Sequence, residues 1–338
     1  MAAPTSNEPL SDPTVRDRAR FFRQALSRRL PGLGESGVGY VFLLPTFLLF
    51  TLFLGFPILY TFYLSFFRFE GVSDETLLWI DLPGFEFQLT RIAELEFVGL
   101  QNYTAMFTDT LFLQASFNTL FILLVQVPLM VGLALLFAVA LNASFVKFRG
   151  VFRTVLALPV SANLVAYSTV FLLLMQESGL VNYLLTSVGL PAIPWLSSSF
   201  WSRMTIVGAV TWRWTGYNMI ILLAGLQNIP QQLYEAAEID GASRIEKFRY
   251  VTVPQLRPVL LFVFVTSTIG TFKLFSEPVI INSGGAPLDS TITIVQYIYQ
   301  TAFIDFRLGY ASALTYVLIF VVSLLSAAQL RIGGSADA

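Results

Sequence analysis

Six long apolar segments constrain this chain more than any other feature of its sequence. A helix needs about 20 consecutive, mostly apolar residues to cross the hydrocarbon core of a bilayer, and each segment reaches that length. The sequence therefore predicts an all-α integral membrane protein with six transmembrane helices. The segments cover residues 39–67, 111–142, 151–176, 203–229, 258–281 and 308–330.

Composition agrees with this class and narrows the chemistry. Hydrophobic residues make up 55% of the chain and charged residues 12%, whereas about a quarter of the residues of a soluble domain are charged. The absence of Cys and His excludes disulfides, thiolate metal sites and Cys nucleophiles, and removes the commonest general base. An enzyme could still use carboxylates, Ser or Lys, but its options are narrow. We expect no catalytic residues, no metal site and no binding to nucleic acid.

The charged residues predict the orientation. Cytoplasmic loops of membrane proteins carry an excess of Lys and Arg. Residues 1–37 and 333–338 are accordingly predicted to be cytoplasmic tails, and 38–332 the six-span domain. The basic region and the first apolar run are both too long for a cleavable signal peptide. The basic residues assigned inside are Arg16, Arg18, Arg20, Arg23, Arg28, Arg29, Lys147, Arg149, Arg153, Arg244, Lys247, Arg249, Arg257 and Arg331. The first outer connection is acidic, with Glu70, Asp74, Glu75, Asp81, Glu86, Glu94, Glu96 and Asp109.

Two outer connections have structure of their own. Residues 68–110 contain Leu-Pro-Gly at 82–84, followed by alternating apolar residues, a pattern that fits a small hairpin or cap. The alternative is an insertion with only a packing role. Residues 177–202 predict a short amphipathic helix over 180–188, followed by prolines and by Trp residues that suit a membrane interface.

A polar segment, EAAEIDGASRIEKFRYVTVPQLRP at 235–258, separates the fourth and fifth apolar segments. Residues 231–240 favour a helix that starts after Pro230, and Gly241 breaks it before a second short helix over 243–250. Two adjacent alanines let one face of the first helix approach another protein closely, as a helix does in a groove. The alternative is a helix lying on the membrane, but such helices have basic polar faces and this one begins with acidic residues.

Several blocks in a fixed order resemble one family. The first block is EAA…G in the polar segment. The others are VGLQNYTAMF at 98–107, FRTVLALPVSANLVAYS at 152–168, LAGLQNIP at 223–230 and SGGAPLDSTITIVQYIYQTAF at 283–303. From about residue 40 to 330 the chain is similar to the permease subunits of binding-protein-dependent ABC importers, in the carbohydrate-uptake branch that includes maltose and glycerol-phosphate permeases. The connection 68–110 is longer than the one usual in that family.

The resemblance implies a type I ABC importer permease fold, a bacterial or archaeal plasma (inner) membrane location, and transport by alternating access. The implied partners are a second, related permease that completes a heterodimer, two cytoplasmic ABC ATPase subunits and an extracytoplasmic substrate-binding protein. ATP and Mg are expected on the ATPase subunits, because this chain has no G-x-x-x-x-G-K-[ST] loop. The segment 231–257 then becomes the ATPase-coupling loop, with Glu235, Ala236, Ala237, Asp240, Gly241 and Pro254 as its site residues.

Two stretches are candidates for the substrate pathway. Residues 212–219 mix aromatics with amide and hydroxyl groups, which suit the faces and hydroxyls of a sugar, although aromatics at helical spacing are also common in packing. The resemblance points to Gly216, Tyr217 and Met219, with Phe272, Lys273, Phe275 and Ser276 opposite them. Trp212, Arg213 and Asn218 complete the candidate set. The alternative for Lys273 is an ion pair with Glu277 at i,i+4.

The sequence thus predicts the permease subunit of an ATP-driven importer for a mono- or oligosaccharide, or for a sugar or glycerol phosphate. Two other classes remain as alternatives. A secondary transporter or channel would require intramembrane proton relays, ion sites or inverted repeats. A membrane enzyme would require a nucleophile and a base clustered at one depth.

Overall fold

The computed structural model describes residues 35–69, 72–82, 85–92, 95–143, 146–283 and 287–334. The chain divides into two compact units, Met1–Tyr63 and Leu64–Ala338. Most of the predicted cytoplasmic tails, 1–37 and 333–338, lies outside the described residues.

The first unit consists of one helix with its apolar side chains exposed. It comprises α2 (Glu35–Phe50), a π-helical stretch η1 (Thr51–Gly55) and α3 (Phe56–Leu64). Residues Phe42–Leu64 are long and apolar enough to cross a membrane. Large side chains such as Phe47 and Leu59 are exposed to 69% and 70%. The apolar side chains of such a helix need a cover, and the helix corresponds to the first predicted span.

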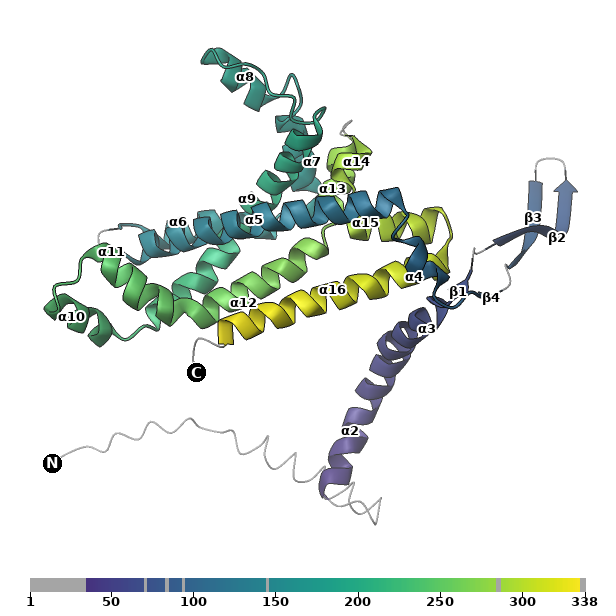
Figure 1. Ribbon diagram of the computed structural model, residues 1–338, viewed down its shortest axis with the longest axis horizontal. Coiled ribbons are helices and arrows are strands. Elements are labelled where there is room, and N and C mark those ends of the chain that lie inside the picture. Colours follow the sequence, from purple (N-terminus) through teal and green to yellow (C-terminus); the bar gives the residue numbers. More distant parts are fainter. Residues whose placement is uncertain are drawn as a thin grey trace. The chain divides into compact units, whose positions relative to one another are not determined.

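The second unit is built around four long helices (Figure 1). They are α5 (Thr110–Asn142), α9 (Ser199–Gln227), α12 (Val253–Phe272) and α16 (Leu308–Gly334). The helix α9 packs along α5, and α12 contacts α5, α9 and α16. The largest core cluster lies where these helices meet and includes Met130, Ala134, Met219, Leu222 and Leu256, all essentially inaccessible.

Two of the predicted spans are interrupted rather than continuous. The segment predicted at 151–176 forms α6 (Arg149–Ala157), a 3-10 turn η2 (Leu158–Ser161) and α7 (Leu164–Leu174), with a bend of 98°. Pro159 lies in the turn, and the side chain of Asn163 caps the new helix by accepting from the backbone N–H groups of Val165 and Ala166. A prolyl ring and a cap at this spacing end one helix and begin another.

The second interruption divides the segment predicted at 258–281. Helix α12 ends at Phe272, and α13 (Ser276–Ser283) begins after a break of three residues. The Thr293 hydroxyl donates to the Leu274 carbonyl at 2.7 Å, which satisfies a backbone acceptor that the break leaves without a helical partner.

Among the described residues, four helices are long and apolar enough to cross a membrane: Phe42–Leu64, Thr110–Asn142, Arg244–Phe272 and Leu308–Gly333. The bent pair α6–η2 and α7 is a fifth if it counts as one span. In the described part of the chain α9, with 29 residues, is long enough but is not among them. Its Arg203, Arg213 and several Thr lower its hydropathy, and many of its side chains are buried against other helices. A helix enclosed by protein can carry such residues. The count of six spans with both ends in the cytoplasm therefore stays a prediction.

Short helical elements lie in the connections next to the helix ends that are predicted to face outward. They are α4 (Gln101–Ala105), α8 (Leu180–Ser187), α14 (Leu288–Thr291), α15 (Ile294–Tyr299) and a π-helical stretch η4 (Gln300–Ile304). The predicted short helix in 177–202 is confirmed as α8. A hairpin in 68–110 is also confirmed, since β2 (Val72–Leu82) pairs antiparallel with β3 (Phe85–Ile92). The fold is thus mostly helical with a small β component.

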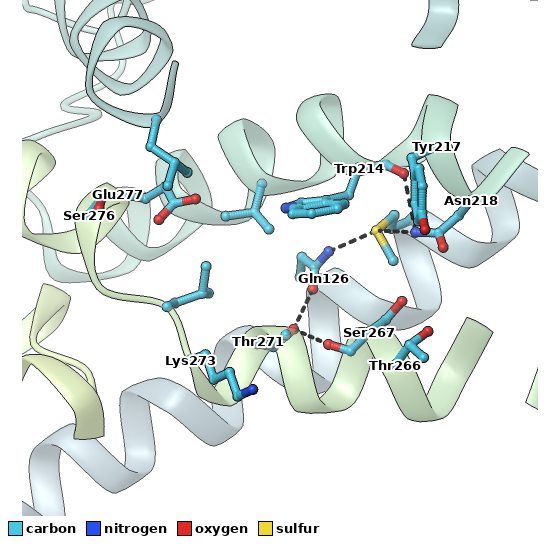
Figure 2. A pocket seen from close by; sticks show the side chains of 15 residues that line it. Gln126, Trp214, Tyr217, Asn218, Thr266, Ser267, Thr271, Lys273, Ser276 and Glu277 are labelled. Carbon is cyan, nitrogen blue, oxygen red and sulfur yellow. Dashed lines mark hydrogen bonds between the residues drawn. The ribbon is translucent and has the colours of Figure 1, made fainter. Parts of the chain in front are cut away.

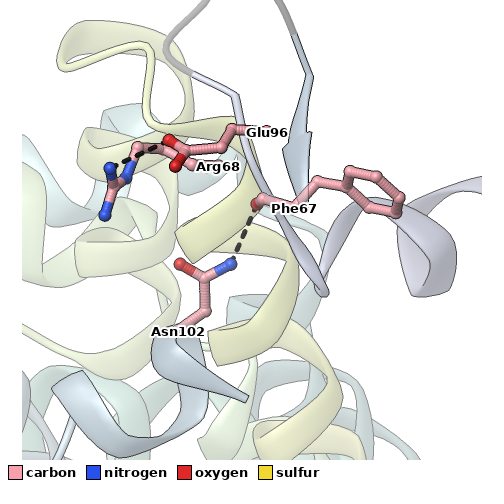
Figure 3. Close-up of polar contacts among 4 residues, drawn as sticks. All are labelled: Phe67, Arg68, Glu96 and Asn102. Carbon is pink, nitrogen blue, oxygen red and sulfur yellow. Dashed lines mark hydrogen bonds and ion pairs between the residues drawn. The ribbon is translucent and has the colours of Figure 1, made fainter. Parts of the chain in front are cut away.

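A second antiparallel pair, β1 (Phe67–Arg68) with β4 (Glu96–Phe97), closes this connection at its base. The Arg68 and Glu96 side chains pair at 3.0 Å, and the Asn102 amide donates to the Phe67 carbonyl at 2.9 Å (Figure 3). The start of α16 passes so close that a Cβ built on Gly309 would lie 1.9 Å from the same carbonyl oxygen. These contacts tie the hairpin's base to α4 and α16.

Asp109 joins three helices at this side of the unit. Its carboxylate caps α5 by accepting from the backbone N–H groups of Leu111 and Phe112, and it accepts from the hydroxyls of Tyr297 in α15 and Tyr310 in α16. Burial alone would raise the pKa of Asp109, but the hydrogen bonds from the two Tyr hydroxyls and the two backbone N–H groups lower it overall.

Replacing Asp109 with Ala is expected to destabilise the second unit by about 3 kcal/mol, because the change removes a helix cap worth about 1 kcal/mol and leaves two Tyr hydroxyls without their acceptor. Thermal unfolding of the purified protein in detergent measures this loss. Asp109→Asn, which keeps a capping oxygen, is the matched control and should lose less. Equal losses in the two variants would contradict this assignment.

Candidate functional site

A cavity of about 310 Å³ lies between α5, α9 and α12, beside the breaks in the two interrupted spans. The start of α7 and the start of α13 contribute to its wall. Figure 2 shows Lys273, Ser276 and Glu277 toward one end, Tyr217 and Asn218 toward the other, and Trp214 and Gln126 between them. The cavity is lined by Gln126, Met130, Leu164, Val210, Trp214, Tyr217, Asn218, Thr266, Ser267, Gly270, Thr271, Lys273, Leu274, Ser276 and Glu277.

One face of α9 supplies the aromatic wall. Val210, Trp214, Tyr217 and Asn218 follow one another at helical spacings of four, three and one residues, so that they share a face. The rings of Trp214 and Tyr217 meet edge to face with centroids 5.8 Å apart. The Asn218 amide donates to the Trp214 carbonyl at 3.1 Å, which holds that amide beside the rings.

The opposite wall is polar and comes from α5 and α12. Thr271 donates to the Gln126 carboxamide oxygen at 2.9 Å, and the Gln126 amide nitrogen contacts the Met130 sulfur at 3.2 Å. Thr266 and Ser267 add two more hydroxyls. The result is a ring face on one side and amide and hydroxyl groups on the other.

Two opposite charges lie at one end of the cavity. Glu277 is only 3% exposed, and its carboxylate accepts a hydrogen bond from the Tyr167 hydroxyl. Lys273 is exposed and also lines the cavity. The alternative of an i,i+4 ion pair between them is wrong in its geometry, because the helix ends at Phe272 and no continuous turn joins the two residues.

Arg213 holds the bend in the third predicted span instead of lining the cavity. It is 8% exposed, and its guanidinium donates to the carbonyls of Ala162 at 2.8 Å and Val160 at 3.2 Å. Its carbon Cζ lies 4.7 Å from the centre of the Tyr167 ring. A buried cation of this kind is retained because it satisfies backbone acceptors that the break would otherwise leave unpaired.

Five other candidates serve packing. Trp212 packs on Tyr167 and Phe171, and Phe275 packs on Tyr299. Met219 and Phe272 belong to the core cluster. Gly216 faces the backbone of α6, since a Cβ built on it would lie 1.7 Å from the Leu156 carbonyl oxygen.

Of the candidate pathway set, Tyr217, Asn218, Lys273 and Ser276 are brought together on the cavity wall. Sequence reasoning missed Trp214 and Gln126. The signal for Trp214 was its helical spacing to Tyr217 and Asn218, and the signal for Gln126 was an amide within the apolar run that follows Phe121 in α5.

The polar segment 231–257 folds as two short helices that lead into α12. Helix α10 (Gln231–Ile239) follows Pro230, and α11 (Arg244–Lys247) continues through the π-helical stretch η3 (Phe248–Thr252). The predicted helix–break–helix pattern is therefore confirmed. Gly241 adopts the left-handed conformation with φ +78° and ends α10. Ser243 and Glu246 form a capping box that starts α11 and lowers the pKa of Glu246.

The coupling-loop candidates lie on this segment as expected. Glu235, Ala236, Asp240 and Gly241 are exposed, whereas Ala237 and Pro254 are half-buried. The structure adds two residues that the sequence analysis did not single out. Ile239 and Ile245, one on each short helix, are 86% and 78% exposed.

Comparison with known proteins decides the family. The model for the family described as binding-protein-dependent transport system inner membrane component matches residues 38–332. The chain belongs to this family. As predicted, the chain is a multi-pass membrane permease of a binding-protein-dependent transport system.

Individual relatives are similar to this chain along most of its length. It is 38% identical over 295 residues to the lactose transport system permease protein of Rhizobium radiobacter, which covers 86% of this chain and 92% of the relative. It is 34% identical over 303 residues to the arabinooligosaccharides transport system permease protein of Bacillus subtilis, covering 89% and 90%.

A solved structure shares the fold. A chain of a bacterial alginate ABC transporter, crystallised in complex with an alginate pentasaccharide-bound periplasmic protein, matches with a TM-score of 0.71 and 21% identity, covering 87% of this chain and 93% of that chain. The predicted ABC importer permease fold is therefore confirmed.

Proposed function

We propose that this chain is the transmembrane permease subunit of an ATP-driven importer for a carbohydrate, in the plasma membrane of a bacterium or archaeon. The observation that carries the proposal is the composition of the cavity wall. Trp214 and Tyr217 offer apolar ring faces to the C–H faces of a sugar, while Gln126, Asn218, Thr266 and Ser267 offer hydrogen-bonding groups to its hydroxyls. A volume of about 310 Å³ lies at the lower end of the range of roughly 300–1,000 Å³ for small-molecule sites. The names of the relatives, which refer to lactose and arabinooligosaccharides, support the same cargo class.

The other subunits of the importer complex are separate chains. A second, related permease would complete the pathway as a heterodimer, and an extracytoplasmic binding protein would deliver the cargo. Two ATPase subunits would bind ATP and Mg and dock on the coupling segment, where Ile239, Ile245 and Glu235 are exposed. Closure of the ATPase dimer then moves α10 and α11, and α12 carries that motion to the cavity because η3 joins α11 to α12 without a break. The proposal includes six spans, with α9 as the fourth, and both termini in the cytoplasm.

Purification of the tagged chain from native membranes tests the assembly. We expect the second permease, the ATPase and the binding protein to co-purify. The complex is then reconstituted, and its ATPase rate is measured with the binding protein and a panel of neutral mono- and oligosaccharides, sugar phosphates and glycerol phosphate. Stimulation by a carbohydrate supports the proposal. Stimulation by no member of the panel, or purification without an ATPase, contradicts it.

Trp214→Ala is expected to lower cargo-stimulated ATPase activity by about tenfold at subsaturating cargo, because an aromatic face on a cargo ring contributes on the order of 1 kcal/mol or more. Trp212→Ala is the matched control: it removes the same side chain two residues away, off the cavity wall. Equal losses in both variants would show that packing of α9, and not the cavity wall, causes the effect.

A further inference from the structure

Two half-helices, α7 and α13, border the cavity in the same way. Each follows the interruption of a predicted span, and each contributes its first residues to the cavity wall, Leu164 from α7 and Ser276 and Glu277 from α13. The two half-helices pack against one another, as Figure 1 also shows. Segments of chain that absorb changes of φ and ψ commonly lie at element ends such as these.

The interruptions themselves are held by α9, α5 and the chain before α15. Arg213 of α9 binds the Val160 and Ala162 carbonyls at the first break. At the second, Thr293 donates to the Leu274 carbonyl, and Thr271 of the last turn of α12 donates to Gln126 of α5. Polar contacts thus hold both breaks, and the half-helices beyond them also pack on α9 through an apolar cluster that includes Ile281 of α13 and Leu172 of α7.

One buried polar contact joins the two half-helices directly. The Tyr167 hydroxyl of α7 donates to the Glu277 carboxylate of α13, and the two residues are 4% and 3% exposed. A hydrogen bond from a hydroxyl to a carboxylate in a protein interior is among the stronger ones, and removal of the Tyr167 hydroxyl takes this donor away from the buried Glu277. The Arg213 guanidinium lies over the Tyr167 ring at 4.7 Å and so sets the direction of the hydroxyl.

We propose that the Tyr167–Glu277 hydrogen bond fastens α7 to α13, so that the two half-helices move as one unit when the cavity changes the side to which it opens. Arg213 is the positioning residue of this pair. Its guanidinium donates to the Val160 and Ala162 carbonyls at the first break and stacks over the face of the Tyr167 ring. The inference rests on the proposed function, because it assigns these residues a task within alternating access. Leu164, Ser276 and Glu277 then shift together, and the charged end of the cavity keeps its shape while its surroundings change.

The chain contains no Cys, so pairs of introduced Cys can carry spin labels without removal of native thiols. One pair is Val170→Cys on α7 with Ser283→Cys on α13, both exposed. The control pair is Val170→Cys with Phe262→Cys on α12, where Phe262 is 55% exposed. Electron spin resonance measures both label–label distances in the reconstituted importer complex, without nucleotide and trapped with ATP and vanadate.

We expect the α7–α13 distance to be the same in the two states and the α7–α12 distance to differ. Tyr167→Phe, which keeps the ring under Arg213 but removes the hydroxyl, should make the α7–α13 distance broader and dependent on the state. It should also raise the cargo-independent ATPase rate on the order of tenfold, the factor that corresponds to the loss of one charge-assisted hydrogen bond. Tyr183→Phe, at a Tyr of α8 that is 68% exposed, is the control and should change neither.

An α7–α13 distance that changes between the states as much as the α7–α12 distance would overturn the inference and leave the proposed function intact. The same holds if Tyr167→Phe behaves like Tyr183→Phe. A complex that hydrolyses no ATP, and in which neither distance responds to nucleotide, would overturn the proposed function and this inference with it.

Discussion

Gly216→Ala is expected to destabilise the second unit by about 3 kcal/mol or more. A Cβ at this position would lie 1.7 Å from the Leu156 carbonyl oxygen and 2.4 Å from its carbon. Both atoms are backbone, so no side-chain rotation can relieve the contact, and α6 itself has to move away from α9. That movement also draws the Val160 and Ala162 carbonyls away from Arg213, which lies one turn before Gly216 on the same helix.

The matched control lies on the same helix. A Cβ at Gly208 would meet no heavy atom within 4 Å, and Ala is a better helix former than Gly by about 1 kcal/mol. Gly208→Ala should therefore leave the melting temperature in detergent unchanged or raise it, whereas Gly216→Ala should lower it or abolish recovery of a monodisperse protein. The two changes add the same atom, so helix propensity cannot explain opposite signs. A Gly216→Ala protein as stable as the wild type would mean that α6 shifts at little cost and that the bend is not held as described.

Local signals explain why the polar segment could be predicted closely and the cavity could not. The signals of the polar segment act within a few residues of the chain, so they can be recognised in the sequence. They are Pro230 before α10, Gly241 after it and the Ser243–Glu246 capping box. The cavity combines side chains from α5, α9, α12 and both breaks. No local pattern states which face of α9 will meet Gln126, because that depends on how four helices pack.

The interrupted spans show a different limit. Residues 151–176 form one apolar run in hydropathy. Hydropathy cannot reveal the bend, because apolar residues lie both before and after it. The bend depends on Pro159 and on the Asn163 cap, which were both present in the sequence, and on Arg213, which comes from another helix some fifty residues later. A buried Arg that caps broken backbone and a buried Arg that lines a pathway look alike in sequence. The contacts of Arg213 with Val160 and Ala162 distinguish them.

Gly241→Ala is expected to abolish cargo-stimulated ATPase activity and transport while leaving membrane insertion and the stability of the second unit nearly unchanged. Gly241 has a φ of +78°, and the backbone N–H groups of Gly241 and Ala242 donate to the carbonyls of Glu238 and Ala237. This is the arrangement that closes a helix with a left-handed residue. An Ala in that conformation costs about 1–2 kcal/mol, which is enough to favour another loop conformation but is confined to an exposed segment.

The consequence is a change in the direction of α10 relative to α11. The Lys247–Glu238 ion pair, at 3.1 Å, and the Tyr234–Thr252 hydrogen bond, at 2.9 Å, connect the two sides of the turn only in the observed arrangement. A partner that binds Ile239 and Ile245 together would then bind more weakly, because the two side chains would no longer have the same relative positions. Glu235→Ala tests the same surface without backbone strain and should weaken co-purification of the ATPase.

The matched control for strain is Gly189→Ala. Gly189 follows α8, in a connection predicted to lie outside, with a φ of +80°, and a Cβ there would also meet nothing within 4 Å. The two variants thus carry the same backbone penalty at two different places. Loss of coupling in Gly241→Ala but not in Gly189→Ala assigns the effect to the coupling segment. Loss in both would assign it to strain alone, and activity in Gly241→Ala would show that the ATPase does not depend on the angle between α10 and α11.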